Sequence, residues 1–462
     1  MTPAFAPFAR KMRDAGLPEI AIDTFAHYYE LLRSGVQGKV PRAEIDPVDD
    51  VPDAGTLGRY RAAGTEALGR AIVLKLNGGL GTSMGMTKAK SLLPVKQGLS
   101  FLDVIAKQTL HLRQLHGVRL PLVLMNSFRT RADSQQVLAR YPALPSAVPP
   151  DFLQNKVPRI LKADLTPVEW PADREHEWCP PGHGDLYTAI VTSGMLRTLL
   201  DQGFEYAFVS NADNLGAVLD LDILGFLAAE QIPFLMEVID RTEADRKGGH
   251  LARRKDGRLL LREVAQCPDD EIESFQDVRV WRYFNANSLW VNLRTLDRVL
   301  HERRGVLGLP MITNEKPVDP DDPGSPRVLQ LETAMGAAIS VFEGAQALRV
   351  PRSRFVPVKT TSDLLVLWSD VYTLADDFRV VLSPARTGGA PFVDLDPKFF
   401  RRVADLEARV PDGAPSLLHC RRLVVRGDVR FAAGVVVEGE VVVQQDGAVP
   451  RVVPAGTRLV GA

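Results

Sequence analysis

Cysteine is scarce in this 462-residue chain, which contains only Cys179, Cys267 and Cys420. Their odd number and wide separation argue against a disulfide framework, and without a CxxC pair nothing supports a zinc site. Scattered thiols of this kind are typical of reduced proteins. We therefore expect a cytoplasmic location.

Long apolar runs and an excess of basic residues are also missing. No uncharged apolar run is long enough to span a bilayer, and charges near the N-terminus interrupt any signal-like segment. Lys and Arg number 56 against 57 Asp and Glu, a net charge of -1, so no general positive field exists for nucleic acid. With 45% hydrophobic and 24% charged residues, the sequence predicts a globular protein without membrane or nucleic-acid partners.

Short apolar runs alternate with helix-like stretches in the middle of the chain. The predicted strands are 72–76, 120–125, 207–210 and 234–239, and the predicted helices include 101–116 and 219–229. This alternation indicates an α/β domain with a largely parallel sheet. Gly, Asn and Asp residues follow the strands, at the carboxyl ends where such sheets bind ligands.

The regions that flank this pattern have other signatures. Residues 2–35 have apolar side chains near helical spacing, which predicts amphipathic helices, and 38–55 reads as a surface connector. Asp256-Gly257 suits a tight turn between two inserted antiparallel strands. From Leu423, short Val-rich runs separated by Gly predict either the rungs of a small β-helix or a β-sandwich edge, linked to the core through 384–400.

The segment LKLNGGLGTSMG at 74–85 follows a predicted strand, where glycines let backbone N–H groups approach phosphate. It lacks the Lys and Ser/Thr that end a Walker A loop, and Met84 replaces a glycine of the dinucleotide fingerprint. Lys88 and Lys90 follow and can offset phosphate charge. From spacing alone, phosphate binding and an ordinary tight turn beside a solvated basic loop are both open.

Two further segments carry groups that suit a phosphorylated ligand. His183 lies between glycines in PPGHGD and can bond a hydroxyl or a phosphate oxygen, or be a structural residue. Asp213 and Asn214 follow a predicted strand, where a carboxylate can hold Mg²⁺ or the pair can cap the next helix.

A basic segment, VPRSRFVPVKTTSD at 350–363, contains Arg352, Arg354 and Lys359. This density of cations suits an anionic ligand, and a surface basic patch is the alternative. No Ser–His–Asp arrangement, metal-spaced Cys/His set or paired-carboxylate motif stands out in the sequence.

Taken together, these segments resemble the eukaryotic-type UTP–glucose-1-phosphate uridylyltransferases. The matching stretches keep the family's order and cover most of residues 71–366: LNGGLGTSMG, PLVLMNSF, PPGHGD, FVSNADNLGA, KGG at 247–249, FNANSLW, QLETAMGAAI and VPRSRFVPVKTTSDLL. The resemblance implies an α/β, Rossmann-like nucleotidyltransferase core with a mixed, mainly parallel sheet at 61–380. An N-terminal helical segment and connector would occupy 1–60, and a C-terminal β-helix domain 381–462.

The resemblance also implies where UTP and glucose 1-phosphate bind. The nucleotide and its phosphates would be lined by Leu76, Asn77, Gly78 and Gly79. The implied uracil contacts are Gln154 and Gly182, and the implied contacts to the hexose and its phosphate are His183, Asn211 and Asn287. Mg²⁺ is the implied cofactor, addressed by Asp213.

Two lysines are implied to be catalytic. Lys359, in PVKT, would grip phosphate, and Lys90 aligns with the family's lysine when counted from the glycines. The family usually reads K-G-P-K-S where this chain has TKAKS at 87–91, so Lys88 is out of pattern and can share or replace the role of Lys90. The implied reaction is in-line attack of the sugar phosphate on the α-phosphorus of UTP. The nucleophile is already an anion, so charge neutralisation and positioning replace a general base.

Alternative functions and the oligomeric state stay open at this stage. A related enzyme can use galactose 1-phosphate or N-acetylglucosamine 1-phosphate instead. A non-catalytic UDP-sugar sensor would not need Lys90, Lys359 and Asp213 together, and an NAD-dependent oxidoreductase needs the fingerprint that Met84 breaks. The end of a β-helix can pair with a second copy, so a homo-oligomer through the C-terminal domain is an expectation, while the short tail ending at Ala462 argues against a large assembly.

Overall fold

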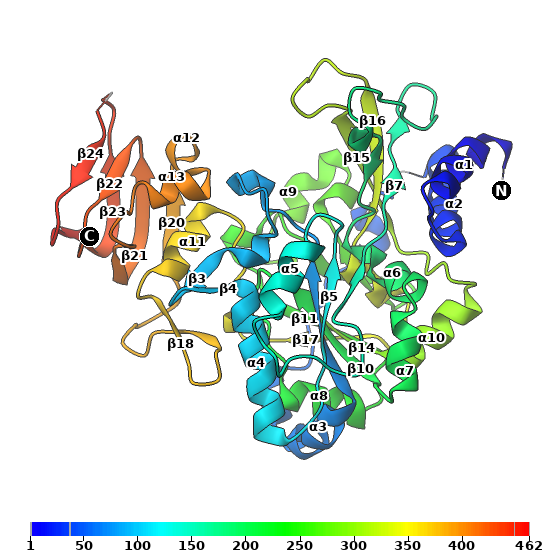
Figure 1. Cartoon of the computed structure of the whole chain (residues 1–462), viewed down its shortest axis with the longest axis horizontal. Helices are drawn as coiled ribbons and strands as arrows, with labels where there is room; N and C mark the ends of the chain where they lie inside the picture. The colour runs from blue at the N-terminus through cyan, green and yellow to red at the C-terminus, as the bar shows by residue number, and fades with distance from the viewer. Residues whose placement is uncertain (1, 37, 448, 462) are drawn as a thin grey trace.

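The computed structural model describes residues 2–36, 38–447 and 449–461, which are built around one mixed sheet (Figure 1). Its main strand order is β1 (Ile45–Asp46), β12 (His250–Arg254), β14 (Tyr283–Asn292), β10 (Tyr206–Asn211), β2 (Ala71–Asn77), β5 (Leu122–Asn126) and β6 (Asp151–Leu153). Strands β10, β2, β5 and β6 are parallel. Antiparallel β14 joins this block to the parallel pair β11 (Phe234–Asp240) and β17 (Gln346–Arg349). The predicted mixed α/β fold with a mainly parallel centre is confirmed.

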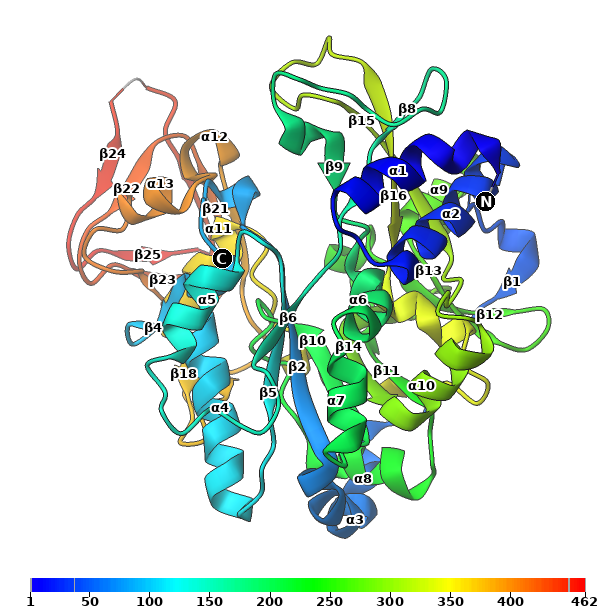
Figure 2. The same ribbon diagram turned by 45° about the vertical axis from the view of Figure 1, so that its right-hand side comes forward.

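Both faces of the central strands are covered by helices, as Figure 2 shows. One face packs against α3 (Arg61–Ala67), α4 (Phe101–His116) and α8 (Leu221–Ala229), and the other against α6 (Leu186–Thr192), α7 (Met195–Asp201) and α10 (Leu293–Glu302). In β2, Val73 faces the first layer, whereas Leu74 faces the second. Burial on both sides explains why the strands read as continuous apolar runs rather than as alternating patterns.

Helix α4 begins and ends where its sequence signals place it. Ser100 accepts a hydrogen bond from the N–H of Asp103, whose carboxylate accepts one from the N–H of Ser100, so the two residues form a capping box. Gly117, at φ +63°, ends the helix in the left-handed region. The helix over 101–116 is therefore confirmed.

The predicted N-terminal helices are α1 (Ala6–Asp14) and α2 (Glu19–Arg33). Their apolar faces meet in a cluster of aromatic rings from Phe5, Phe8, Phe25 and Tyr29, with ring centroids 4.8–6.0 Å apart. This cluster packs beside the hairpin β15 (Met311–Pro317) and β16 (Arg327–Thr333). No helix in the described part of the chain is long and apolar enough to cross a membrane.

The C-terminal strands lie at one end of the molecule (Figure 1). A parallel sheet contains β20 (Phe392–Leu395), β21 (Ser416–Arg426), β23 (Val436–Gln444) and β25 (Arg458–Val460), and a second parallel pair is β22 (Val429–Phe431) with β24 (Arg451–Val453). The segment 384–400, expected to link the C-terminal strands to the core, also contains β20 and α12 (Pro397–Phe400). Val393 of β20 pairs with Leu423 of β21, so this segment is part of the sheet.

The remaining strands form small sheets around the core. The Asp256-Gly257 turn joins β12 to β13 (Leu259–Arg262), an antiparallel pair as predicted. Two-residue and three-residue strands complete the set: β3 (Pro94–Lys96), β4 (Leu99–Ser100), β7 (Val157–Pro158), β8 (Ile160–Leu161), β9 (Trp178–Cys179), β18 (Tyr372–Leu374) and β19 (Val380–Leu382). The remaining helices are α5 (Arg131–Leu138), α9 (Ile272–Phe275), α11 (Thr361–Trp368) and α13 (Val403–Glu407).

Candidate functional site

The parallel strands end together at one edge of the sheet. Leu76 at the end of β2 pairs with Asn211 at the end of β10, and the N–H of Ala212 donates to the Leu76 carbonyl at 3.0 Å. On the other side of β2, Asn126 ends β5, and its carbonyl accepts from the N–H of Gln154 at 2.8 Å. The sequence-predicted Leu76, Asn211 and Gln154 therefore share the carboxyl edge, where α/β sheets bind ligands.

The glycine loop leaves β2 at this edge and packs closely on its neighbours. A β-carbon at Gly78 would lie 2.7 Å from Oε1 of Gln154, so a larger residue there would displace the Gln154 side chain. The carbonyl of Gly79 accepts from the N–H of Lys90 at 3.0 Å, which closes the loop. The side chain of Asn77 points away from the loop, because its Nδ2 donates to Oδ1 of Asn126 and to Oγ of Ser134, each at 2.7 Å. Only the backbone of Asn77 is thus available to a ligand at the loop.

Lys90 and Asp213 form an ion pair at the mouth of this loop. The Lys90 Nζ lies 2.6 Å from Oδ2 of Asp213, and the two side chains are 16% and 23% exposed. Lys88 is exposed at the surface of the same loop. The alternative that Asp213 and Asn214 cap the next helix is wrong, because α8 begins at Leu221 and its cap is Asp220.

The segment that carries Lys359 is attached directly to the Asp213 loop. The N–H of Val358 donates to the Asp213 carbonyl at 3.2 Å, and Oδ1 of Asn214 accepts from the N–H of Val356 at 2.8 Å. Lys359 itself is exposed, and its Nζ lies 5.9 Å from the ring centroid of Phe355. The structure therefore brings Lys359 to the same region as Lys90 and Asp213, although the chain separates them widely.

The other two cations of the basic segment have protein partners. Arg352 donates to both carboxylate oxygens of Asp245, at 2.7 and 3.0 Å. Arg354 is buried and donates to both oxygens of Glu237, at 2.8 and 2.6 Å. Arg354 is therefore inside the protein and not part of a surface basic patch, whereas Arg352 and Lys359 line one cavity.

A cavity of about 660 Å³ opens beside Lys359. It is lined by Lys247, Phe284, Phe355 and residues 389–391, among others. Gly248 packs on the Phe284 ring, where a β-carbon would come within 1.9 Å of Cε2, so the KGG stretch at 247–249 lies closely against the cavity wall. No role was predicted for Lys247 from the sequence. Its place in the short KGG stretch is the sequence signal that could have identified it as a site residue.

His183 is held in one orientation by the backbone. Its Nδ1 accepts a hydrogen bond from the N–H of Met335 at 3.0 Å, so Nε2 carries the proton of the neutral ring. Burial lowers the pKa of His183 to about 4. Gly182, at φ +79°, precedes it, and a β-carbon there would lie 2.5 Å from the carbonyl oxygen of Thr333. His183 therefore presents a neutral N–H donor at pH 7.

The buried carboxylate of Asp185 connects the segment that carries His183 to the segment that carries Gln154. Asp185 accepts from the N–H and the Nδ2 of Asn155, at 2.6 and 2.9 Å. Burial raises the pKa of Asp185 to about 6, while the bonds from Asn155 oppose that change. Residues 154–155 and 183–185 are thereby fixed to each other, which places the two predicted uracil contacts, Gln154 and Gly182, on joined segments.

Asn287 reaches the same edge on the antiparallel strand β14. Ser288 pairs with Ser210 of β10, so Asn287 lies beside the end of β10, where Asn211 stands. Asn287 has a φ of +52°, and its N–H donates to Oδ1 of Asn285 at 2.9 Å. A non-glycine residue in this conformation is strained, and such strain concentrates at functional positions.

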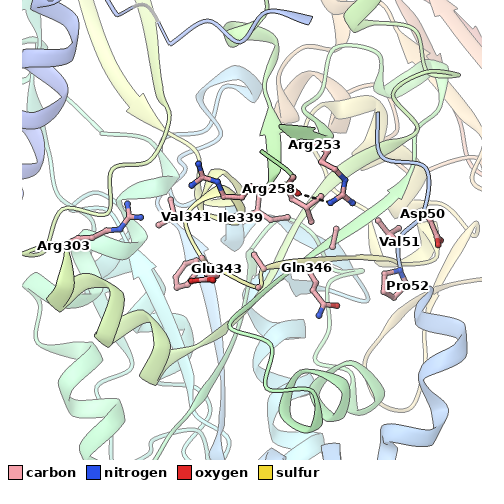
Figure 3. Close-up of a pocket in the computed structure, with 16 residues that line it drawn as sticks. Asp50, Val51, Pro52, Arg253, Arg258, Arg303, Ile339, Val341, Glu343 and Gln346 are labelled. Carbon is pink, nitrogen blue, oxygen red and sulfur yellow. Dashed lines mark hydrogen bonds between the residues drawn. The ribbon is translucent and has the colours of Figure 1, made fainter. Parts of the chain in front are cut away.

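A second cavity, of about 700 Å³, has a different lining, which Figure 3 shows. Arg253, Arg258 and Arg303 line it, but each is already bonded: Arg253 to the Gly257 carbonyl, Arg258 to Asp256, and Arg303 to the Leu307 carbonyl. The predicted site residues do not line it. The polar cluster at the carboxyl edge is therefore the better candidate.

Comparison with known proteins gives a consistent result. Residues 22–438 match the family model for UTP--glucose-1-phosphate uridylyltransferase. A curated protein of that name from Hordeum vulgare is 43% identical over 394 residues, covering 85% of this chain and 81% of the relative. The UDP-glucose pyrophosphorylase from Leishmania major, a mutant solved in complex with UDP-glucose, is 45% identical with a TM-score of 0.94, covering 100% and 99% of the two chains. A Trypanosoma brucei structure is 42% identical with a TM-score of 0.89, covering 100% of each chain.

Proposed function

This chain belongs to the UTP–glucose-1-phosphate uridylyltransferase family, and we propose that it makes UDP-glucose and pyrophosphate from UTP and glucose 1-phosphate. One structural observation supports this activity in addition to family membership. The glycine loop, the Lys90–Asp213 pair and the Lys359 segment lie together at the edge of the sheet. These are the groups that a reaction between two polyanions requires.

The reaction is one displacement at phosphorus. A phosphate oxygen of glucose 1-phosphate attacks the α-phosphorus of UTP, a P–O bond forms, and the bond to the β-phosphate breaks as pyrophosphate leaves. Because the attacking group is already an anion, the protein's task is to hold the reactants in line and to offset their charge. Lys90 and Lys359 supply positive charge for this task, and the 660 Å³ cavity beside Lys359 gives room for phosphates.

The polar groups around Lys90 and Lys359 orient the substrates. We assign the uracil to the backbone of Leu76, Gly78 and Gly182 and to the side chain of Gln154. The neutral N–H of His183 suits a phosphate oxygen, since it donates without adding a charge that titrates near pH 7. Asn211 and Asn287 suit the hexose hydroxyls.

Mg²⁺ is the proposed cofactor, with Asp213 as its protein ligand. Among the described residues no group of three His, Cys, Asp or Glu side chains could hold a metal ion. Oδ2 of Asp213 accepts from Lys90, and within the described residues its Oδ1 accepts no hydrogen bond. This donor set fits Mg²⁺, which takes one or two carboxylates and completes its shell with phosphates and water. When bound it would offset charge on the phosphates.

The deciding experiment is pyrophosphate release from UTP with a panel of sugar 1-phosphates, with and without Mg²⁺. Fast Mg²⁺-dependent release with glucose 1-phosphate supports the proposal. Release only with galactose 1-phosphate or N-acetylglucosamine 1-phosphate keeps the chemistry and changes the substrate. A folded protein that binds UDP-glucose but releases no pyrophosphate would be a sensor instead of an enzyme.

We also propose that the C-terminal strands form a β-helix domain over 381–462 that lets the protein self-associate. The parallel pairs β21–β23 and β22–β24 support this, since Val425 pairs with Val443 and Val429 with Arg451, offsets that suit successive coils. Val442, Val452 and Val460 are 58–69% exposed there. In the same proposal, residues 1–60 form the N-terminal segment and residues 61–380 the catalytic domain. We also propose that the protein is located in the cytoplasm. Light scattering of the full chain tests self-association.

A further inference from the structure

Lys75 is a buried basic residue of β2, three positions before Gly78 of the glycine loop. Lys75 is 2% exposed, and its Nζ lies 5.3 Å from the ring centroid of Phe208. The Nζ donates to Oγ of Ser210 at 2.6 Å, directly across from it on β10, and to the carbonyl of Ala217 at 2.8 Å. A buried amino group is costly, so an apolar residue would suit a merely structural strand position better.

The Ala217 carbonyl belongs to the loop that carries Asp213. The next carbonyl, that of Val218, is held by a second buried basic side chain, because Nη2 of Arg354 donates to it at 2.9 Å. Arg354 is itself fixed by Glu237, which also accepts from Nε1 of Trp290 at 2.9 Å. Two buried basic side chains therefore hold consecutive carbonyls of one loop.

The same loop is fastened on its other side to the segment before Lys359. Nδ2 of Asn214 donates to the Arg354 carbonyl at 3.1 Å. A β-carbon at Gly216 would lie 2.5 Å from the carbonyl oxygen of Ser353, so the two segments touch through their backbones. The position of residues 213–218 thus sets where the Asp213 carboxylate lies relative to Lys90 and Lys359.

We propose that Lys75 is a positioning residue: by holding the Ala217 carbonyl it fixes the loop 213–218 and keeps the Asp213 carboxylate in place between Lys90 and the Lys359 segment. The inference rests on the proposed function, which gives Asp213 its task. A displacement of about 1 Å at a reacting centre can cost about 10²-fold in rate, so a distant support of this kind matters to turnover.

The test replaces the amino group by a thioether of similar length. Lys75→Met fills the same space and leaves the Ala217 carbonyl without its donor. We expect kcat to fall by about 10- to 100-fold and the Mg²⁺ concentration for half-maximal rate to rise by about tenfold, as for lost supports of metal ligands. We expect amide hydrogen exchange of residues 213–218 in the free protein to accelerate, which is a readout independent of activity.

Lys96→Met is the matched control. Lys96 also donates from Nζ to backbone carbonyls, those of Leu367, Trp368 and Ser369, but it is not one of the site residues. Both variants should lose thermal stability, and only Lys75→Met should change kcat and the exchange of 213–218. If Lys75→Met matches the control in both readouts, the inference is overturned.

A second variant tests the inference if Lys75→Met does not fold, and the wild type tests the proposed function separately. If Lys75→Met does not fold, Ser210→Ala removes one acceptor of Lys75, and kcat should fall by about fivefold, the value of one hydrogen bond. Unchanged kcat and unchanged exchange of 213–218 in that variant would overturn the inference. A folded wild type that releases no pyrophosphate rejects the proposed function instead, and the exchange comparison still decides whether Lys75 holds the loop.

Discussion

The Nζ of Lys90 lies 2.6 Å from a carboxylate oxygen of Asp213, 123 positions further along the chain. This pair joins the glycine loop after β2 to the loop after β10. Because both side chains are largely shielded from solvent, their charges are oriented before a ligand arrives. This pairing distinguishes Lys90 from Lys88, which is exposed on the same loop.

Alanine at Lys90 should therefore reduce turnover far more than alanine at Lys88. For Lys90→Ala we expect kcat to fall on the order of 10²- to 10³-fold, as when one charge-stabilising contact is removed. Lys88 is exposed, so Lys88→Ala should stay within about twofold, as expected for a surface charge. Steady-state pyrophosphate release measures both. Equal losses in the two variants would show that Lys88 shares the role.

Alanine at Lys359 should lower kcat by about 10²- to 10³-fold while the protein stays folded, because the side chain is exposed. Lys398→Ala is the control, since Lys398 is also exposed and its Nζ lies 5.3 Å from the ring centroid of Phe399. Thermal unfolding and kcat are measured on both. Turnover near that of the wild type in Lys359→Ala would remove this residue from the mechanism.

Four central strands and the helices α1, α2, α4 and α8 could be predicted because their signals are local. Apolar runs followed by Gly, Asn or Asp located β2, β5, β10 and β11, and the helix-like stretch 101–116 located α4. The strand within 384–400 was not predicted, because β20 is stabilised by pairing with β21, which lies far along the chain. Local composition carries no information about such a partner.

Site residues on the glycine loop and in PPGHGD could be singled out by type and spacing, but their partners could not. The pairing of Arg354 with Glu237 spans 117 positions, and no rule of spacing connects them. Sequence reasoning therefore counted Arg354 among cations available to a ligand. Lys75 was missed for the same reason, since its acceptors Ser210 and Ala217 are brought to it only by the packing of β2 on β10.

The pH dependence of folding should show that His183 stays neutral. Its pKa in the folded protein, about 4, is below the ordinary value of 6.5, so folding favours the neutral ring. The stabilisation is complete above pH 6.5 and is lost as the pH falls from 6.5 toward 4. Urea unfolding of wild type and His183→Gln from pH 7 to pH 4 measures this. The stability difference should move in favour of the variant at low pH, and parallel curves would contradict the lowered pKa.

Glycine is required at position 182 by contact as well as by conformation, and Gly194 separates the two causes. Both residues have positive φ, +79° and +75°, so alanine at either should cost about 1–2 kcal/mol in backbone strain. A β-carbon at Gly194 meets nothing within 4 Å, whereas one at Gly182 would press on Thr333 beside His183. Gly182→Ala should therefore also raise the KM for UTP or lower kcat, by about tenfold or more for a displacement approaching 1 Å. Gly194→Ala should lose stability alone. Equal kinetics in the two variants would mean that the Thr333 contact does not position His183.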